Sequence, residues 1–280
     1  MTSKSIRRRL YEALWSDRVR AVLGRVRFVR RIYIGWIRTH PYDDANGVET
    51  RSTLAARRGT SHDAGGERAL PYGGSQPSIV RTALASLPDR ERYAFVDLGC
   101  GKGRPLIVAS EFSFSHLLGV ELSPDLASVA RRNAAIVAAR HPERTPIAIQ
   151  IGDATAVTAP TDRVAFFMYH PFDRDLVADL IRNLERQLAG GLRHAFLLYY
   201  NPVHGEVVDL SPHFERWSAA TLPYADDELG FGPDLSDTLV IWQSRPPLYP
   251  ARRDAERSIV VHASGTSAGL ASIRSLHAPA

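Results

Sequence analysis

Short apolar runs alternate along the middle of this chain with longer stretches in which apolar and polar residues are mixed. Runs that end on a polar residue or a glycine are typical of buried strands, and the stretches between them have the length of helices. The pattern therefore predicts an α/β fold with a mostly parallel sheet. The predicted strands are 95–98, 117–121, 147–151, 164–169, 195–200 and 238–243.

Local signals show where two helices begin. Ser123 is followed by Pro124, and a serine at the N-cap with a proline at the first helical position is a common helix start. Apolar residues that recur on one face predict a second helix over 78–87. The segment just before that helix contains a Gly-Gly pair, which favours a turn. It is equally compatible with a loop that folds over a ligand.

The segment Phe95–Arg104 carries most of the functional information. It runs an apolar strand into a turn with Gly99, Gly101 and Gly103, and a helix-compatible apolar stretch follows. Glycines at a turn of this kind let the backbone approach a ligand closely. Asp97 lies two positions before the first glycine. Strand, glycine turn and helix together predict a nucleotide-type ligand near a helix N-terminus.

Two further carboxylates follow at the ends of the next two strands. Glu121 lies about 20 residues after the glycine turn, where ribose hydroxyls are bound in open α/β sheets. Asp153 and Ala154 follow the strand 147–151. Either acid alone is explained equally well as a solvated strand end or a helix cap. Their joint placement with Asp97 at one edge of the sheet instead predicts a ligand site.

The glycines alternate as G-x-G-x-G, whereas the dinucleotide fingerprint is G-x-G-x-x-G. Together with the three acids, this spacing resembles the class I S-adenosylmethionine-dependent methyltransferases, over roughly residues 70–243. The resemblance implies a three-layer, Rossmann-like open sheet of about seven strands, mostly parallel with an antiparallel edge strand. It also implies S-adenosylmethionine as cofactor. The cofactor-binding residues it implies are Asp97, Gly99, Gly101 and Gly103 for the methionine part, Glu121 for the ribose hydroxyls, and Asp153 with Ala154 for the adenine.

A narrower resemblance involves the segment 47–50, a tyrosine-centred turn and a later Pro-Phe pair. These features look like a group of bacterial class I methyltransferases of unassigned substrate, loosely similar to the seven-strand histone-lysine methyltransferases. By this resemblance Tyr72 and Ser75 belong to a loop that closes over the cofactor. It names no substrate.

The acceptor side is predicted at the ends of the fourth and fifth strands. His170, Pro171 and Phe172 stand where amine and amide methyltransferases have Asn or Asp followed by two prolines. The departure puts that arrangement in doubt. His170 has a pKa suited to a general base, and it is equally suited to capping the next helix. Tyr200 and Asn201 are candidates for the acceptor pocket, although strand packing also explains the tyrosine.

Composition and charge indicate that the chain consists of several parts with different properties. With 280 residues, 44% hydrophobic content and one cysteine, the chain can bury a full core and forms no internal disulfide. Residues 1–40 carry eleven Lys or Arg against Glu12 and Asp17, a net charge of +9 in a chain of +5. The predicted parts are a basic amphipathic helical extension at 1–40, a linker or lid at 41–70, a methyltransferase domain at 71–248 and a flexible tail at 249–280.

The basic extension has three interpretations. It lies on an anionic membrane surface, binds nucleic acid, or docks on the catalytic domain with its arginines in solvent. The chain shows neither a secretion signal nor an apolar run long enough to span a membrane, which favours a cytoplasmic location, with peripheral membrane association as the alternative. No Cys/His cluster has metal-site spacing.

The expected function is methyl transfer from S-adenosylmethionine to an unidentified acceptor, by in-line displacement. A protein side chain, RNA and a small molecule are all open as acceptors. Two alternatives remain: a non-catalytic cofactor-binding or scaffold protein with a basic anchor, and a nicotinamide-dependent oxidoreductase. The sequence predicts no oligomeric state.

Overall fold

A computed structural model describes residues 39–51, 74–169, 172–228, 231 and 236–252 of the chain. The predicted basic helix of the N-terminal extension lies outside these residues, as does most of the predicted C-terminal tail. The four-part division of the chain stays a prediction. None of the helices within the described ranges is long and apolar enough to cross a membrane.

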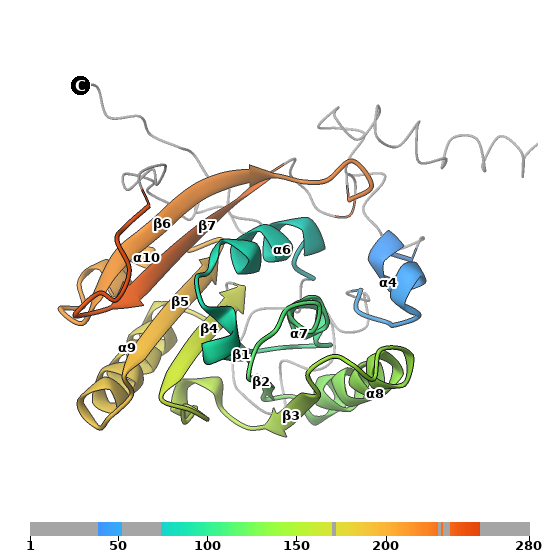
Figure 1. Ribbon diagram of the computed structural model, residues 1–280, viewed down its shortest axis with the longest axis horizontal. Helices are drawn as coiled ribbons and strands as arrows, with labels where there is room; N and C mark the ends of the chain where they lie inside the picture. Colours follow the sequence, from blue (N-terminus) through green and yellow to red (C-terminus); the bar gives the residue numbers. More distant parts are fainter. Residues whose placement is uncertain (1–38, 52–73, 170–171, 229–230, 232–235, 253–280) are drawn as a thin grey trace, which may run out of the picture.

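The described residues form a seven-stranded sheet in the order β3-β2-β1-β4-β5-β7-β6 (Figure 1). Strands β1 to β5 are parallel, and β7 is antiparallel to both of its neighbours. The reversed strand therefore lies one place in from the edge formed by β6. This sheet confirms the predicted Rossmann-like α/β architecture. The strands are β1 Ala94–Leu98, β2 His116–Glu121, β3 Ile147–Ile151, β4 Arg163–Tyr169, β5 His194–Tyr200, β6 Phe214–Pro223 and β7 Ser236–Ser244.

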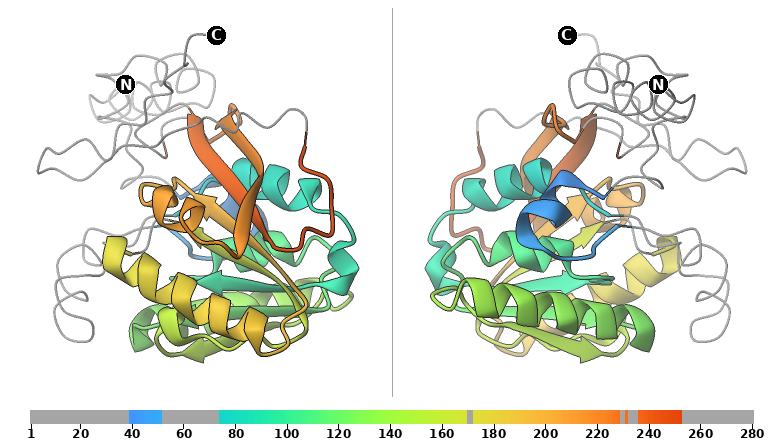
Figure 2. Two further views of the ribbon diagram at one scale, coloured as in Figure 1. Left: turned by 90° about the vertical axis from the view of Figure 1, so that its left-hand side faces the viewer. Right: turned by 90° about the vertical axis from the view of Figure 1, so that its right-hand side faces the viewer.

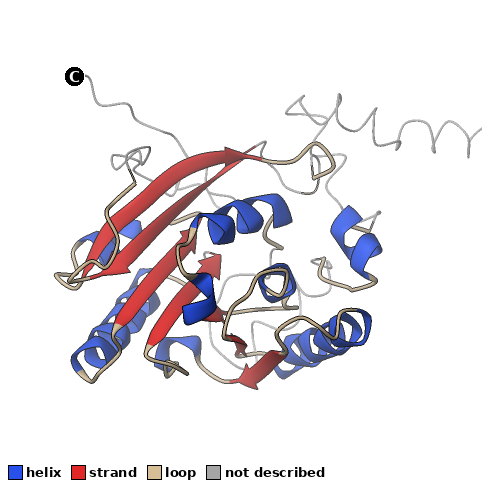
Figure 3. Cartoon of the chain, viewed as in Figure 1, coloured by secondary structure: helices blue, strands red, loops and turns tan. Residues whose placement is uncertain are grey.

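Helices cover both faces of the sheet and complete the three layers (Figures 2 and 3). One hydrophobic core contains residues of α6, α7 and α8, and the other contains residues of α9 and α10. The central strands contribute alternate residues to the two cores, as the two-residue period of a strand requires. The helices are α4 Pro41–Asn46, α6 Pro77–Ser86, α7 Arg104–Ala109, α8 Pro124–Arg140, α9 Arg174–Ala189 and α10 Gly205–Asp209. Within the described residues, the 3₁₀ turn η2 Arg90–Arg92 precedes β1, and η3 Ala154–Ala156 lies between β3 and β4.

The helix starts follow local capping rules. The Ser123 side chain accepts a hydrogen bond from the Leu126 amide at the start of α8, which confirms the predicted cap. Asp173 caps α9 in the same way through the Leu176 amide, at 2.9 Å. These caps satisfy backbone donors that have no partner within the helix.

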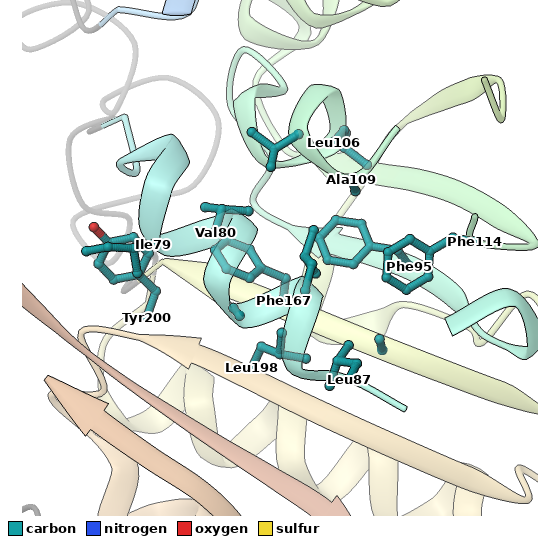
Figure 4. Close-up of a cluster of buried hydrophobic side chains, with 14 of the residues drawn as sticks. Ile79, Val80, Leu87, Phe95, Leu106, Ala109, Phe114, Phe167, Leu198 and Tyr200 are labelled. Carbon is teal, nitrogen blue, oxygen red and sulfur yellow. The ribbon is translucent and has the colours of Figure 1, made fainter. Parts of the chain in front are cut away.

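The core beside α6 and α7 contains a row of large side chains between the helices and the sheet. Phe95 and Phe167, from neighbouring strands, have ring centroids 6.0 Å apart. Figure 4 shows Tyr200 at one end of this row next to Ile79, with its hydroxyl oxygen turned away from the other drawn side chains. The row therefore ends in a polar group at the carboxyl end of β5.

The strand order alone indicates where a ligand would bind, without reference to any side chain. The chain moves outward from β1 to β2 and β3, and then returns to the other side of β1 with β4. In open α/β sheets, ligands bind outside the carboxyl ends of the strands at this reversal. The glycine turn, residues 99–103, follows β1 at that point.

Gly119 in β2 provides a test of how tightly the turn packs on the sheet. A Cβ there would lie 2.6 Å from Leu106 Cδ1 and 2.7 Å from Cys100 Sγ, both of them buried. We expect Gly119→Ala to lower the free energy of unfolding by about 1–3 kcal/mol, because overpacking displaces the turn. Urea denaturation measures this. The control is Gly152→Ala, whose nearest contact would be an ordinary 3.7 Å; an equal loss in both variants would contradict the packing argument.

Candidate functional site

The glycine turn is held in place by the neighbouring strand β2. Gly99, Gly101 and Gly103 have φ angles of 74°, 54° and 85°, a region that residues with a Cβ rarely adopt. The amides of Gly99 and Cys100 both donate to the carbonyl of Val120, at 2.9 and 3.0 Å. The three glycines are therefore required by the backbone path of the turn.

Glu121 lies directly against this turn. Its Oε2 accepts a hydrogen bond from the Gly101 amide at 2.7 Å, and its Oε1 accepts one from the Ser123 amide at 2.9 Å. The side chain is only 8% exposed, and burial raises its pKa, although these amide hydrogen bonds oppose the shift. A carboxylate has about four lone-pair sites, so each oxygen can accept a further hydrogen bond from a ligand.

Asp97 is the most unusual group of the site. It is 2% exposed, and its Oδ2 has no hydrogen-bond partner within the described part of the chain. Burial, followed by the charge of Glu121, raises the pKa of Asp97 well above its usual range. A buried acceptor left unpaired costs about 1–3 kcal/mol, so it requires an explanation. A ligand with a positively charged donor would supply the missing partner.

Residues 39–51, here called the N-terminal strap, lie over the glycine turn beside α8 (Figure 2). Lys102 Nζ, from the turn, donates to Glu49 Oε1 at 2.5 Å. The Asn133 side chain of α8 accepts from the Glu49 amide at 3.0 Å and donates to the carbonyls of Glu49 and Lys102, at 3.0 and 2.9 Å. The strap thus fixes the turn from the side opposite β2.

Arg104, the first residue of α7, connects three segments. Its Nε donates to Thr50 Oγ1 at 2.6 Å, and its Nη1 donates to the carbonyl of Ser75 at 3.0 Å. Its Nη2 lies 3.6 Å from Asp43 Oδ1, and both side chains are almost fully buried. Neither Lys102 nor Arg104 pairs with Asp97 or Glu121 among the described residues. The acids of the strap neutralise the basic groups of the turn, and the acids of the site remain uncompensated.

The ends of β2 and β3 lie side by side. The Gly152 amide donates to the Glu121 carbonyl at 3.0 Å. Asp153 is exposed, and its Oδ1 accepts from the amide and the hydroxyl of Thr155, both at 2.8 Å. Asp153 therefore caps η3, the structural role that the sequence left open. Both hydrogen bonds of that cap use Oδ1.

A second polar cluster lies at the carboxyl ends of β4 and β5. The Tyr200 hydroxyl donates to Asp237 Oδ2 at 2.6 Å, and the Tyr224 hydroxyl donates to the same oxygen at 2.6 Å. Asn201 Nδ2 donates to Asp237 Oδ1 at 3.2 Å. The Tyr169 and Tyr200 rings are 4.4 Å apart. Asn201 has a φ of 51°, and such values in residues with a Cβ are concentrated at functional sites.

The structure brings most of the predicted site residues to one edge of the sheet. Asp97, Glu121 and the glycines surround the turn, and Asp153 with Ala154 follows at the end of β3. Ser75 is joined to this site through Arg104. Its Oγ is buried and has no partner in the described residues. Tyr72 and His170 lie outside the described residues, so their predicted roles stay predictions.

Sequence reasoning missed Asp237 and Tyr224. Asp237 stands near the start of β7, and because β7 is reversed, its start lies at the carboxyl ends of β4 and β5. The position of Asp237 at this edge follows from the sequence only when the direction of β7 is taken into account. Nothing in the sequence signals that Tyr224 donates to the same carboxylate.

No protein-family model and no curated protein matches the sequence. Solved structures resemble parts of it. TrmN from Thermus thermophilus has 16% identity and a TM-score of 0.41, with 60% of this chain and 48% of that chain covered, so the match spans about half of that protein. An RNA methyltransferase from Salinibacter ruber, in complex with S-adenosyl-L-homocysteine, has 19% identity, a TM-score of 0.40, and 64% and 97% covered. Magnesium protoporphyrin IX methyltransferase from Synechocystis, with bound S-adenosylmethionine, has 12% identity and a TM-score of 0.42, with 60% of this chain and 76% of that chain covered.

The unpaired Asp97 carboxylate predicts a stability that depends on pH. Its pKa is raised in the folded protein, so the folded state binds the proton more tightly, and stability falls as pH rises above the unfolded-state value of about 4. We expect Asp97→Asn to stabilise the ligand-free protein by about 1 kcal/mol or more at pH 7, with the gain shrinking toward pH 4. Urea denaturation at several pH values measures this.

The control for that experiment is Asp162→Asn. Asp162 is exposed and pairs with Arg193 at 3.7 Å, so its removal should change stability by less than about 0.5 kcal/mol. A loss of stability in Asp97→Asn at pH 7, or a gain that does not vary with pH, would show that the buried charge is not destabilising.

Proposed function

We propose that this protein is an S-adenosylmethionine-dependent methyltransferase that binds its cofactor across the glycine turn. The observation that carries the proposal is Asp97, a buried carboxylate with an unpaired oxygen next to a turn that Glu121 already caps. Two acids that remain uncompensated at a sheet reversal favour a ligand that brings positive charge and hydroxyl donors. S-adenosylmethionine has an ammonium group, a sulfonium centre and a ribose diol.

The individual groups match the parts of this cofactor. Asp97 is suited to the ammonium group, because its unpaired oxygen needs a charged donor. Glu121 is suited to the ribose hydroxyls, because its two oxygens are fixed by the Gly101 and Ser123 amides and keep lone pairs to spare. This assignment of roles agrees with the one that the sequence resemblance implies.

The end of β3 offers a surface for the adenine ring. Leu122 and Ile151 are 39% and 43% exposed, which is unusual for large apolar side chains, and Ile151 pairs with Glu121 in the sheet. Apolar side chains next to a ligand site provide contact area for a flat ring. Asp153 lies two residues after Ile151 and offers a carboxylate oxygen to the adenine amino group.

The same charges argue against a nicotinamide dinucleotide. A pyrophosphate needs backbone amides and positive potential at the turn. Here the Gly101 amide donates to Glu121, and Lys102 and Arg104 are bound to the strap. An anion would therefore meet two buried carboxylates, which disfavours the oxidoreductase alternative.

When bound, S-adenosylmethionine supplies an electrophilic methyl carbon on its sulfonium sulfur. The work of the chain is then to position the acceptor in line with the bond that breaks. Holding two reactants at attack geometry contributes roughly 7–11 kcal/mol of barrier reduction in favourable cases. On this proposal the acceptor enters over the ends of β4 and β5, where Tyr169, Tyr200 and Asn201 lie.

Calorimetry of the purified chain with S-adenosylmethionine, S-adenosylhomocysteine and NAD⁺ tests cofactor identity. We expect binding of the first two and none of the third. Labelled S-adenosylmethionine incubated with fractionated cell extract then separates an enzyme from a scaffold, because only an enzyme transfers label to an acceptor. Cofactor binding without any transfer would favour the non-catalytic alternative.

Replacing Glu121 tests the ribose assignment. We expect Glu121→Ala to weaken S-adenosylmethionine binding at least tenfold, about 1.4 kcal/mol. Glu121→Gln keeps one hydrogen-bond acceptor and should lose less. Because Glu121 also holds Gly101 and Ser123, circular dichroism must show that both variants are folded. The control is Glu206→Ala, an exposed acid of α10 that pairs with Arg174; unchanged calorimetric affinity in Glu121→Ala would refute the assignment.

A further inference from the structure

The acceptor edge of the sheet has a wall made of three tyrosines and one acid. Tyr169 ends β4, Tyr200 ends β5, Tyr224 follows β6, and Asp237 stands near the start of β7. Tyr169 and Tyr200 are paired across the parallel strands β4 and β5, and Asp237 reaches the same edge because β7 is reversed. These four residues are here called the acceptor wall. The wall lies beyond the glycine turn, on the side of β1 that is opposite β2.

The hydroxyl protons of the wall have a fixed direction. Tyr200 and Tyr224 each have a single hydroxyl proton, and each donates it to Asp237 Oδ2. Burial raises the pKa of Tyr200 well above its usual value, so the proton stays on the phenol. The Tyr200 oxygen in turn accepts from the Gln76 amide at 3.4 Å. With their protons committed to Asp237, these hydroxyls offer a ligand only oxygen lone pairs.

The charge of the wall has no counterion among the described residues. Asp237 is 3% exposed, accepts hydrogen bonds from two hydroxyls and one side-chain amide, and forms no ion pair with the described residues. Asp237 Oδ2 lies 2.6 Å from the hydroxyl of the fully buried Tyr200, and the Tyr169 ring packs with its centroid 4.4 Å from the Tyr200 centroid while part of the Tyr169 surface stays exposed. A buried negative charge next to an exposed aromatic ring attracts cations and repels anions.

We propose that the methyl acceptor is an amine, which docks as its ammonium form against the exposed part of the Tyr169 ring. The proposal rests on the proposed methyltransferase function. Asp237 acts as a positioning residue, since it orients the two hydroxyls and supplies the charge. Overall, the amine nitrogen forms a bond to the methyl carbon, the sulfonium–methyl bond breaks with its electron pair on sulfur, and the ammonium releases one proton to water.

The test uses the full chain saturated with S-adenosylhomocysteine, whose binding is measured first. Failure at that step overturns the proposed function, and the steps that follow concern the acceptor alone. The complex is then titrated with n-butylammonium and with butyrate, which have similar size and opposite charge. We expect butylammonium to bind at least tenfold more tightly. Equal binding, tighter butyrate binding, or no butylammonium binding overturns the amine proposal.

Variants separate the role of Asp237 from general stability. Asp237→Asn should reduce butylammonium affinity at least tenfold while S-adenosylhomocysteine affinity stays within twofold. Asp227→Asn, which removes an exposed charge from the segment between β6 and β7, should change neither. Loss of both ligands in Asp237→Asn would overturn the positioning role.

A second pair of variants does not depend on Asp237. Tyr169→Phe keeps the ring and should retain butylammonium affinity within threefold, whereas Tyr169→Leu should lose at least fivefold. Equal affinities in these two variants would show that the aromatic face does not bind the amine, and would overturn the proposal.

Discussion

The candidate site is organised around two carboxylates that stay buried without a counterion at the glycine turn. The charge of Glu121 adds to the cost of burying an ionised Asp97, yet the nearby basic residues Lys102 and Arg104 pair with neither acid. Lys102 and Arg104 bind acids of the N-terminal strap. This pairing lets the turn contain basic side chains without cancelling the negative potential that a cationic ligand needs. The strap is therefore part of the electrostatics of the site, although it contributes none of the predicted ligand-binding residues.

A second buried carboxylate without a counterion among the described residues lies further along the same edge of the sheet. At the acceptor wall, Asp237 is again buried, and again its hydrogen bonds come from neutral groups. Neutral donors satisfy the lone pairs of a carboxylate and leave its charge in place, whereas an ion pair would remove it. Two such sites at one sheet edge fit a reaction in which both partners carry positive charge when they bind. That fit links the proposed cofactor and the proposed acceptor.

The sequence predicted the elements that local signals determine. Strand ends, the cap at Ser123 and the alternating glycines all follow from short-range rules, and the structure has them within one or two residues. It did not predict the strap, because the contact between Lys102 and Glu49 spans 53 residues and neither residue has a distinctive neighbour. Asp237 was missed for a related reason: its place follows from strand direction, which only the assembled sheet shows.

Arg104 has a consequence for how distant parts of the molecule respond to one another. It binds the strap through Thr50 and the segment before α6 through Ser75, and it begins the helix that follows the turn. Free energies linked through one residue are reciprocal. A coupling free energy between docking of the strap and binding of a ligand that is carried by these contacts therefore has the same size in both directions. The first residue of α7 is thus the side chain that physically joins the N-terminal side of the molecule to the helix that follows its site.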